Sequence, residues 1–223
     1  MAPQPPIALP RAVLFDWDNT LVETWDCIHA ALVATFHAMG MEAWSMADTQ
    51  ARVRQSLRDS FPKLFGERWQ DARDIYYHHF STTHLDHLRA KDGAVELLDA
   101  LANRGVYLGV VSNKTGKFLR KEAESLGWLN RFERLVGATD AEADKPALAP
   151  VRLALEPIGV EPRQPGIERI WFVGDADIDL ECAHAAGCVP ILLGPADSVI
   201  DARFPPRYRF DGCPALSALV LEL

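Results

Sequence analysis

Short, uninterrupted apolar runs recur along the chain and are the feature that most restricts its fold. A run such as Ala12-Val13-Leu14-Phe15 shows no polar alternation, which is typical of a parallel strand covered on both faces. The runs lie at residues 12–15, 106–111, 135–136, 170–173 and 189–193. Because segments with helical periodicity separate them, the pattern predicts βα units and an α/β fold with a doubly wound parallel sheet.

Residues 23–89 break this alternation, because they contain helix-like stretches and no convincing strand. One helix face there is lined by apolar side chains: Trp25, Ile28, Leu32, Phe36 and Met39. Gly40 then supplies a stop signal. We interpret such aromatic stripes as core. We therefore expect an all-helical cap at residues 23–89, inserted into an α/β core made of residues 1–22 and 90–223.

Further helices are expected between the later apolar runs. Four residues of one such segment share a face: Phe118, Leu119, Ala123 and Leu126. Gly127 marks the end of that helix. The stretch 156–166 contains three prolines and is expected to form a surface loop before the next strand.

Charge and cysteine usage narrow the class of protein. The formal net charge is −8 at pH 7, whereas binding to a nucleic acid backbone needs a clustered excess of Lys and Arg, so no nucleic acid partner is expected. The first eleven residues show neither an early basic region nor a long apolar run, so we expect no secretion signal and no membrane anchor. Four widely spaced cysteines without a CxxC pair indicate buried thiols, which favours the cytoplasm.

Polar clusters directly follow three of the predicted strands. They occupy residues 16–20 (DWDNT), 112–114 (SNK) and 174–179 (GDADID). In an open parallel sheet, ligands bind in the crevice outside the carboxyl ends of the strands. We therefore expect these three clusters to converge on one site.

The residue types in these clusters favour phosphoryl transfer. Asp16, Asp175 and Asp179 offer hard carboxylate oxygens that suit Mg²⁺, and without a cation they would repel one another. Ser112 offers a hydroxyl to a phosphoryl oxygen, and Lys145 supplies a positive charge beside it. The sequence therefore predicts a site that binds Mg²⁺ and a small phosphorylated metabolite.

The order of these motifs resembles the haloacid dehalogenase superfamily. The motifs are DWDNTLV after the first strand, VVSNK after the second, Asp144-Lys145-Pro146, and VGDADID followed by AHAAG. They span residues 12 to about 195. The helical cap and the AHAAG ending make the chain most similar to the phosphoglycolate-phosphatase-like group, which includes nucleotidases and sugar-phosphate mutases.

The resemblance implies specific roles. Asp16 is the expected nucleophile that forms an aspartyl-phosphate, and Asp18 is the general acid and base. Mg²⁺ is expected on the Asp16 side chain, the Asp18 backbone carbonyl and Asp175, with Asp179 in support. The phosphate group is expected to meet the following residues: Thr20, Ser112, Asn113 and Lys145, the last of which also assists catalysis.

The chain departs from the family pattern at two positions. Asn19 stands where the phosphatase branch usually has glycine, and Ala176 stands where it usually has serine. Asp18 favours phosphate esters, because the dehalogenases and phosphonate-cleaving members lack a carboxylate at that position. Asp177 is interpreted as a solvated carboxylate in the first turn of a helix rather than as a third ligand.

Other readings stay open. A phosphosugar mutase or a nucleotidase of the same superfamily would use the same aspartates, and a binding protein that kept the fold without catalysis is a third possibility. Arg54 or Arg58 is a candidate contact for an anionic substrate. Two further sets of residues resemble metal ligands. The first is interpreted as a solvated helix face: His78, His79, His84 and His87. The second is interpreted as part of a closely packed helix: Cys182, His184 and Cys188.

Overall fold

A six-stranded sheet lies at the centre of the computed structural model, which describes residues 7–194 and 202–223. The first six residues, part of the start that we expect to carry no signal, lie outside the described ranges. Each strand is parallel to its neighbours. From one edge to the other the strands are β5 (Arg134–Ala138), β4 (Tyr107–Thr115), β1 (Ala12–Phe15), β6 (Ile170–Gly174), β7 (Val189–Leu193) and β8 (Tyr208–Phe210).

The first strand, β1, occupies the middle of this sheet because all four of its residues are apolar and buried. The chain moves outward from β1 through β4 to β5, then returns to β6 and moves the other way to β8. The direction of winding therefore reverses between β1 and β6. In open α/β sheets this reversal marks the ligand-binding crevice. The predicted doubly wound α/β fold is confirmed.

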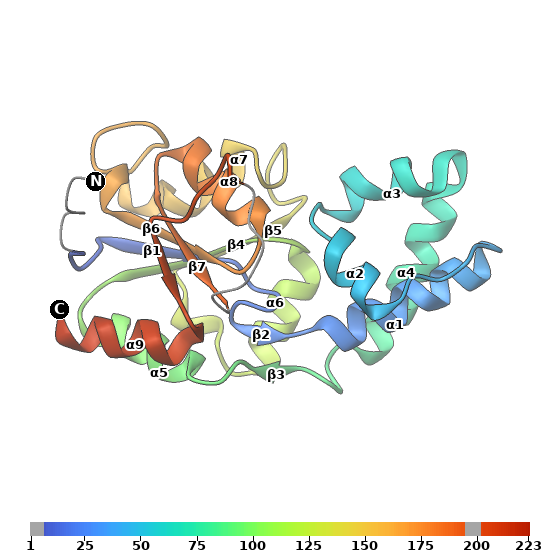
Figure 1. Cartoon of the computed structure of the whole chain (residues 1–223), viewed down its shortest axis with the longest axis horizontal. Helices are drawn as coiled ribbons and strands as arrows, with labels where there is room; N and C mark the ends of the chain where they lie inside the picture. Colours follow the sequence, from blue (N-terminus) through green and yellow to red (C-terminus); the bar gives the residue numbers. More distant parts are fainter. Residues whose placement is uncertain (1–6, 195–201) are drawn as a thin grey trace.

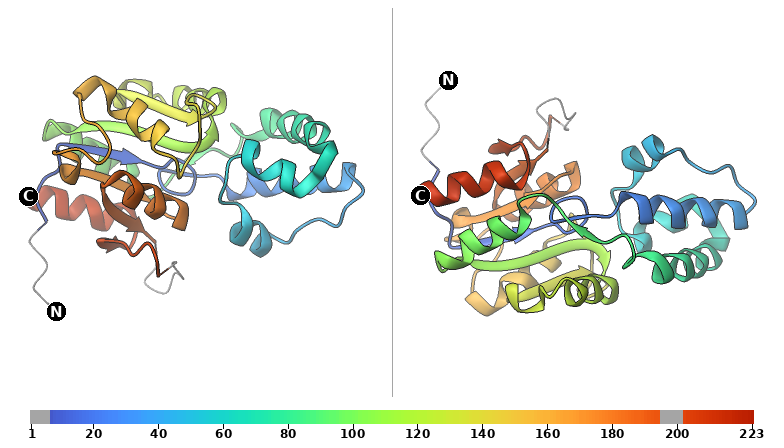
Figure 2. Two further views of the ribbon diagram at one scale, coloured as in Figure 1. Left: turned by 90° about the horizontal axis from the view of Figure 1, so that it is seen from above. Right: turned by 90° about the horizontal axis from the view of Figure 1, so that it is seen from below.

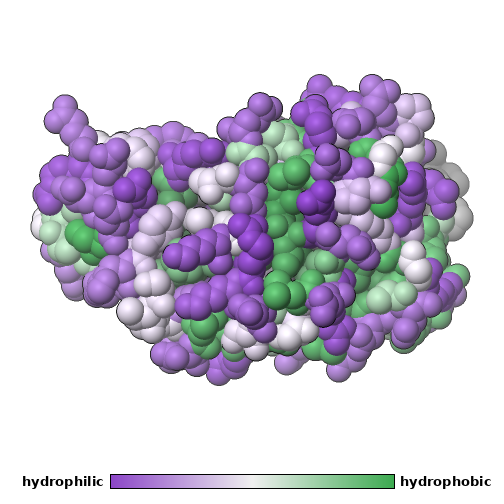
Figure 3. Space-filling view, turned by 180° about the vertical axis from the view of Figure 1, so that it is seen from behind, coloured by the Kyte–Doolittle hydropathy of each residue, from purple (hydrophilic) through white to green (hydrophobic). Residues whose placement is uncertain are grey.

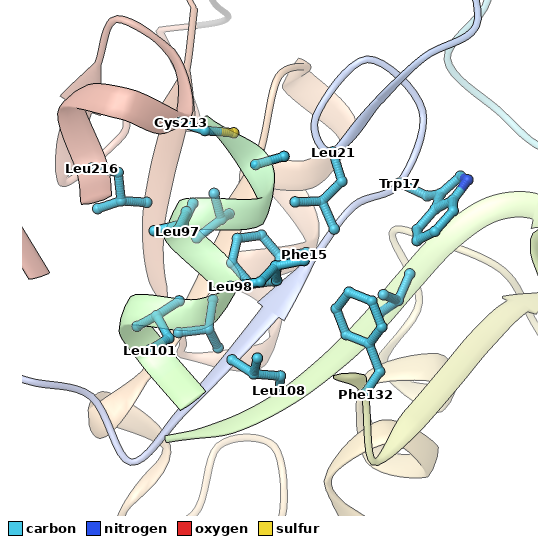
Figure 4. Packing of buried hydrophobic residues seen from close by; sticks show 14 of the residues in the cluster. Phe15, Trp17, Leu21, Leu97, Leu98, Leu101, Leu108, Phe132, Cys213 and Leu216 are labelled. Atoms are coloured by element: carbon cyan, nitrogen blue, oxygen red, sulfur yellow. The ribbon is translucent and has the colours of Figure 1, made fainter. Parts of the chain in front are cut away.

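Helices cover both faces of the sheet (Figure 1). α5 (Ala94–Asn103), α6 (Gly116–Ser125) and α9 (Gly212–Glu222) pack on one face. α7 (Leu148–Leu155) and α8 (Asp177–Ala186) pack on the other. Figure 4 shows the first of these layers, where Phe15 of β1 meets Leu97 and Leu98 of α5. The two apolar layers bury β1 completely. They therefore fix the edge of the sheet at which the polar residues that follow β1 emerge.

Four helices of the predicted cap lie beyond the sheet, to the right in Figure 1 and in both views of Figure 2. They are α1 (Trp25–Ala38), α2 (Met46–Arg52), α3 (Leu57–Phe65) and α4 (Trp69–Thr83), with the short 3₁₀ helix η1 (Gly66–Arg68) between the last two. Aromatic residues such as Phe36, Phe61 and Phe80 form their own apolar cluster. The antiparallel pair β2 (Val22–Glu23) and β3 (Arg89–Ala90) joins this region to the core. The division into two domains stays a prediction.

Three stretches differ from the pattern that the sequence suggested. β4 continues to Thr115, so that Ser112 and Lys114 lie within the strand, where its register with β5 shifts. The half-buried edge strand β8 was not predicted, because its short run contains Arg209. The expected loop at 156–166 begins with the 3₁₀ helix η3 (Glu156–Ile158), and η4 (Ile167–Arg169) follows it; η2 (Leu129–Arg131) lies earlier in the chain.

The face of the molecule opposite to the view of Figure 1 is largely polar (Figure 3). Figure 3 shows one face of the molecule, where hydrophilic side chains dominate and hydrophobic ones gather mainly near the middle. Within residues 7–194 and 202–223, none of the helices has the length and apolar character that crossing a membrane requires. The four cysteines are buried and form no disulfide, as predicted.

Close packing of β5 against the start of α6 yields a first prediction. A Cβ atom on Gly137 would lie 2.5 Å from the Cα atom of Gly116 and 2.6 Å from the carbonyl oxygen of Lys114, both backbone atoms that cannot turn aside. Gly137→Ala should therefore lower the free energy of unfolding by about 3 kcal/mol. Gly109→Ala is the matched control, because the one close contact of its Cβ is with the end of the Leu14 side chain at 2.9 Å, while the next nearest atoms lie at ordinary contact distances of 3.5 and 3.7 Å.

Urea denaturation of the two variants and the wild-type chain measures this difference. Gly109→Ala should cost about 1 kcal/mol, since a side-chain end can rotate. Equal losses in the two variants would contradict the backbone contact at Gly137.

Candidate active site

The reversal of strand order brings the predicted polar clusters to one edge of the sheet. Asp16 directly follows β1, and Asp175 directly follows β6, its neighbour in the sheet. Ser112 lies in the last part of β4, and Lys145 lies between β5 and α7. These four residues line one cavity, which cap residues also line.

The acidic group of this cavity consists of Asp16, Asp175 and Asp179. Carboxylate oxygens of the three lie within 4.8 Å of one another. Burial, followed by the charges of Asp179 and Asp16, raises the pKa of Asp175 to about 8. Burial also raises the pKa of Asp16 to about 7, although Lys145 opposes it. Carboxyl groups that ionise this reluctantly are stabilised by a cation, so these hard oxygen donors fit Mg²⁺.

The buried cation of the site is Lys145, whose side chain is only 2% exposed. Its Nζ donates to Asp16 Oδ1 and to Asp179 Oδ1, each at 2.7 Å. Burial alone would lower the pKa of Lys145, but the two carboxylates raise it above its usual value. Lys145 is therefore a fixed positive charge beside Asp16.

Side chains from distant segments hold the backbone around Lys145. Asn113 of β4 accepts the Lys145 amide at 2.9 Å and donates to the Lys145 carbonyl at 3.2 Å. The neighbouring Asp144 accepts the Thr139 amide at 3.0 Å and pairs with the Arg58 guanidinium at 2.7 Å. Asn113, predicted to meet phosphate, thus fixes the position of Lys145 and also lines the cavity.

The two arginines that were candidate substrate contacts have different surroundings. Arg58 contacts Asp144 through Nε and Nη2, and it lines a separate surface pocket instead of the cavity. Arg54 lines the cavity, and its Nη1 donates to the carbonyls of Gln50 and Val53. The geometry therefore gives Arg58 a structural contact and leaves Arg54 as the basic cap residue at the cavity.

Thr20 and Ser112 support the site in different ways. The Thr20 hydroxyl donates to Asp175 Oδ1 at 3.0 Å, so Thr20 orients a carboxylate rather than lining the cavity. Ser112 does line the cavity, and its Oγ accepts the Lys114 amide at 3.2 Å. Because this bond uses a lone pair, the Ser112 hydroxyl hydrogen can still face a phosphoryl oxygen.

The two departures from the family pattern have local explanations. Asn19 adopts a φ of 61°, in the left-handed region that glycine favours and asparagine tolerates better than most residues. Its Oδ1 also accepts the Thr24 amide at 3.2 Å. Ala176 has no side-chain acceptor, and its amide donates to Asp179 Oδ2 at 3.1 Å. Neither residue disturbs the acidic group.

Asp18 belongs to a different ionic group from Asp16. Its Oδ1 lies 2.7 Å from the Nζ atom of the buried Lys114. Burial raises the pKa of Asp18, although Lys114 opposes the shift. A carboxyl with a raised pKa holds its proton more readily, as a general acid must. The predicted contact of the Asp18 backbone carbonyl with a metal stays a prediction.

Glu122 completes the second ionic group beneath Asp18. It is fully buried and accepts from Lys114 Nζ at 2.7 Å, Trp17 Nε1 at 2.7 Å and His84 Nδ1 at 2.8 Å. Burial would raise the pKa of Glu122, but Lys114 and the hydrogen bonds lower it below its usual value. Figure 4 shows the Trp17 nitrogen directed away from the apolar cluster. Because an ionised carboxylate only accepts, His84 Nδ1 carries the hydrogen.

The interpretation of the cap histidines was partly wrong. His78 and His79 are exposed on α4, as a solvated helix face requires, whereas His87 is exposed beyond the end of that helix. His84 is fully buried, because Glu122 gives it a charged partner inside the protein. In the described ranges, the acidic group is the set of three ligand residues whose oxygens lie close enough to share a metal ion.

Sequence reasoning did not assign roles to Lys114 and Glu122. Lys114 stood in the SNK motif without a function, because a lysine after a strand is usually solvated. Glu122 carried a stronger signal, since it lies on the same face of α6 as Phe118, Leu119 and Ala123. An acidic residue on an apolar helix face indicates a buried partner.

This network yields a prediction on stability. Glu122→Gln removes the charge that compensates Lys114 and one of the acceptors of Trp17 and His84, so it should lower the free energy of unfolding by about 3 kcal/mol. Glu124→Gln, an exposed position on the same helix, should change it by no more than about 0.5 kcal/mol. Chemical denaturation measures both values. Equal stabilities would show that Glu122 carries no buried charge.

Comparisons with known proteins agree with this geometry. A phosphoglycolate phosphatase of Rhodospirillum rubrum is 31% identical over 197 residues, which cover 83% of this chain and 79% of that protein. The pyrophosphatase PpaX of Halalkalibacterium halodurans is 27% identical over 94% of this chain and 96% of its own length. The crystal structure of a predicted phosphoglycolate phosphatase from Haemophilus somnus superposes with a TM-score of 0.81 at 20% identity, covering 98% of this chain and 100% of that one.

The family match itself reaches from β1 to β7 and includes the site. Residues 13–192 match the haloacid dehalogenase-like hydrolase family, from the second residue of β1 to the fourth of β7. The matched segment contains Asp16, Lys145 and Asp175, which share one cavity. Fold, motif order and sequence similarity therefore lead to one conclusion: the chain belongs to the haloacid dehalogenase-like hydrolase family.

Proposed function

We propose that this hydrolase is a Mg²⁺-dependent phosphatase that cleaves small phosphate monoesters through an aspartyl-phosphate on Asp16. The observation that carries the proposal is the unequal placement of two neighbouring aspartates. Asp16 is part of the acidic group and contacts Lys145, whereas Asp18 contacts Lys114 in a separate ionic group. Phosphatase and pyrophosphatase relatives support the same reaction class.

In the first step, Asp16 attacks with Oδ2, the oxygen that Lys145 does not hold. The bond from Oδ2 to phosphorus forms while the bond from phosphorus to the ester oxygen breaks, and Asp18 gives its proton to the departing alkoxide. The Lys145 ammonium and the Ser112 hydroxyl bind phosphoryl oxygens as charge develops on them. The alcohol then leaves and Asp18 is a carboxylate.

In the second step, Asp18 takes a proton from a water molecule whose oxygen bonds to phosphorus. The bond to Asp16 Oδ2 breaks, so inorganic phosphate leaves and Asp16 becomes a carboxylate again. Bound at Asp16 and Asp175, Mg²⁺ supplies further positive charge for the phosphoryl oxygens. Lys145 keeps its charge throughout, because Asp16 and Asp179 raise its pKa.

The roles of the two aspartates can be separated by substitution. Asp16→Asn should abolish turnover and the phosphoenzyme, because the nucleophile is gone. Asp18→Asn should reduce turnover about 10²–10⁴-fold, yet still become phosphorylated by an activated aryl phosphate whose leaving group needs little protonation. Intact-protein mass spectrometry after mixing with 2,4-dinitrophenyl phosphate detects the adduct. A phosphate adduct on Asp16→Asn, mapped to another residue, would overturn the assignment.

Metal dependence follows from the acidic group. Chelation should stop turnover, and Asp175→Asn should weaken Mg²⁺ binding, whereas Asp177→Asn, two residues along the chain, should not. Asp16 and Asp175 have pKa values raised to about 7 and 8, so protons compete with the metal and Mg²⁺ affinity should fall as pH drops through about 8 and then about 7. Isothermal titration at several pH values measures this. Affinity that rises toward low pH, or full turnover after chelation, would contradict the metal site.

A further inference from the structure

The cavity has two unlike halves. Its floor is made by the charged residues of the sheet edge, among them Asp16, Asp18 and Lys145. Its roof is made by the cap, whose helices lie beyond the carboxyl edge of the sheet (Figure 1). Seven apolar or aromatic cap side chains line it: Trp25, Ile28, Val53, Leu57, Tyr76, Tyr77 and Phe80. The alcohol part of any phosphate ester must enter this half, since the phosphate belongs on the floor.

The polar cap residues in the lining are few. They are Arg54, Gln55 and two tyrosines, and Gln55 Oε1 accepts from Lys63 Nζ at 2.8 Å. The Tyr77 hydroxyl is hydrogen-bonded to Thr115 Oγ1 at 2.7 Å. The ring of Tyr76 stacks on Phe80 with centroids 5.6 Å apart and an interplanar angle of 13°. Phe118 of α6 extends the apolar wall, and it packs edge-on against Phe80 at 5.1 Å. Ring carbons rather than hydrogen-bonding groups therefore form most of the wall.

Charges in the cavity are also unfavourable for a second anionic group. Arg54 is the cap cation in the lining of the described structure, and its Nη1 is held by two backbone carbonyls. Lys114 is enclosed by Asp18 and Glu122, and Lys145 by Asp16 and Asp179. A carboxylate on the leaving group would lose its hydration in this apolar space, where one partly engaged guanidinium is available to it. Burying the carboxylate charge there is therefore unfavourable.

We propose that the cap half of the cavity is a subsite for an apolar leaving group, so that the substrates are phosphate monoesters of hydrophobic alcohols. This inference rests on the proposed phosphatase function and names the substrate class for it. Pockets that select small ligands combine apolar walls with a few placed polar groups, and here the polar groups lie on the phosphate side. A compact acid ester such as 2-phosphoglycolate lacks the surface that this roof would cover.

A homologous series of alkyl phosphates tests the subsite, because the acidity of the leaving alcohol stays nearly constant along the series. Each methylene that enters the roof should raise kcat/KM about fourfold, so hexyl phosphate should exceed ethyl phosphate about 16-fold if two of its four extra methylenes enter and about 250-fold if all four do. 2-Phosphoglycolate should rank with or below ethyl phosphate. A flat series, or 2-phosphoglycolate as the best ester, would overturn the inference.

Matched tryptophan variants locate the effect. Trp25→Ala removes a wall of the cavity and should lower the ratio of hexyl to ethyl kcat/KM about tenfold. Trp69→Ala makes the same chemical change on a half-buried cap residue outside the lining and should leave the ratio unchanged. Leu57→Asn, on the roof at α3, repeats the test if Trp25→Ala fails to fold. Equal ratios in all variants would place the alkyl chain elsewhere.

The outcomes separate the two levels of the proposal. Turnover of 2,4-dinitrophenyl phosphate that Asp16→Asn abolishes supports the phosphatase function whatever the alkyl series shows. If that activity is present and the series is flat, the apolar subsite alone is wrong. If every ester resists hydrolysis, the proposed function fails and the subsite fails with it.

Discussion

The ammonium of Lys145, 2.7 Å from both Asp16 and Asp179, is the contact that allows this chain to bury acidic residues at the end of its central strand. Three carboxylates whose oxygens lie within 4.8 Å of one another repel strongly when they are removed from water. One lysine offsets only part of that charge, which is why the pKa values of Asp16 and Asp175 remain high. The uncompensated remainder is what suits the group to a divalent cation.

Segments from several parts of the fold are needed to position the Lys145 ammonium. The reversal of strand order between β1 and β6 sets Asp16 beside Asp175, but Lys145 comes from a connection outside any strand. Its backbone is held by Asn113 from β4 and, through Asp144, by Arg58 from the cap. A cap residue thus helps to fix a core lysine, so the position of the cap and the charge balance of the site are physically linked.

The sequence predicted the sheet and the convergence of its polar clusters because buried parallel strands leave a strong apolar pattern and because such strands end at one edge. It did not predict that β4 continues through Lys114. The last residues of β4 are polar, so they lack the apolar pattern of a buried strand, and their register with β5 is shifted. Nor did it place His84 in the interior, because the partner that makes burial possible, Glu122, is 38 residues away. A buried ion pair between residues so far apart in the chain depends on tertiary contacts, and the hydrophobic periodicity of the sequence gives no sign of them.

Two residues apart, Asp16 and Asp18 acquire different chemistry because each is paired with a different lysine and a different second carboxylate. Asp16 shares Lys145 with Asp179 and faces the acidic group, while Asp18 shares Lys114 with Glu122. The second pair also contacts His84, which follows α4 of the cap. The direct ion-pair partner of Asp16 is therefore a core residue, whereas the network around Asp18 reaches the cap through His84. Changes at cap residues other than Arg58 can alter the apolar half of the cavity while Asp16 and Lys145 keep their contacts.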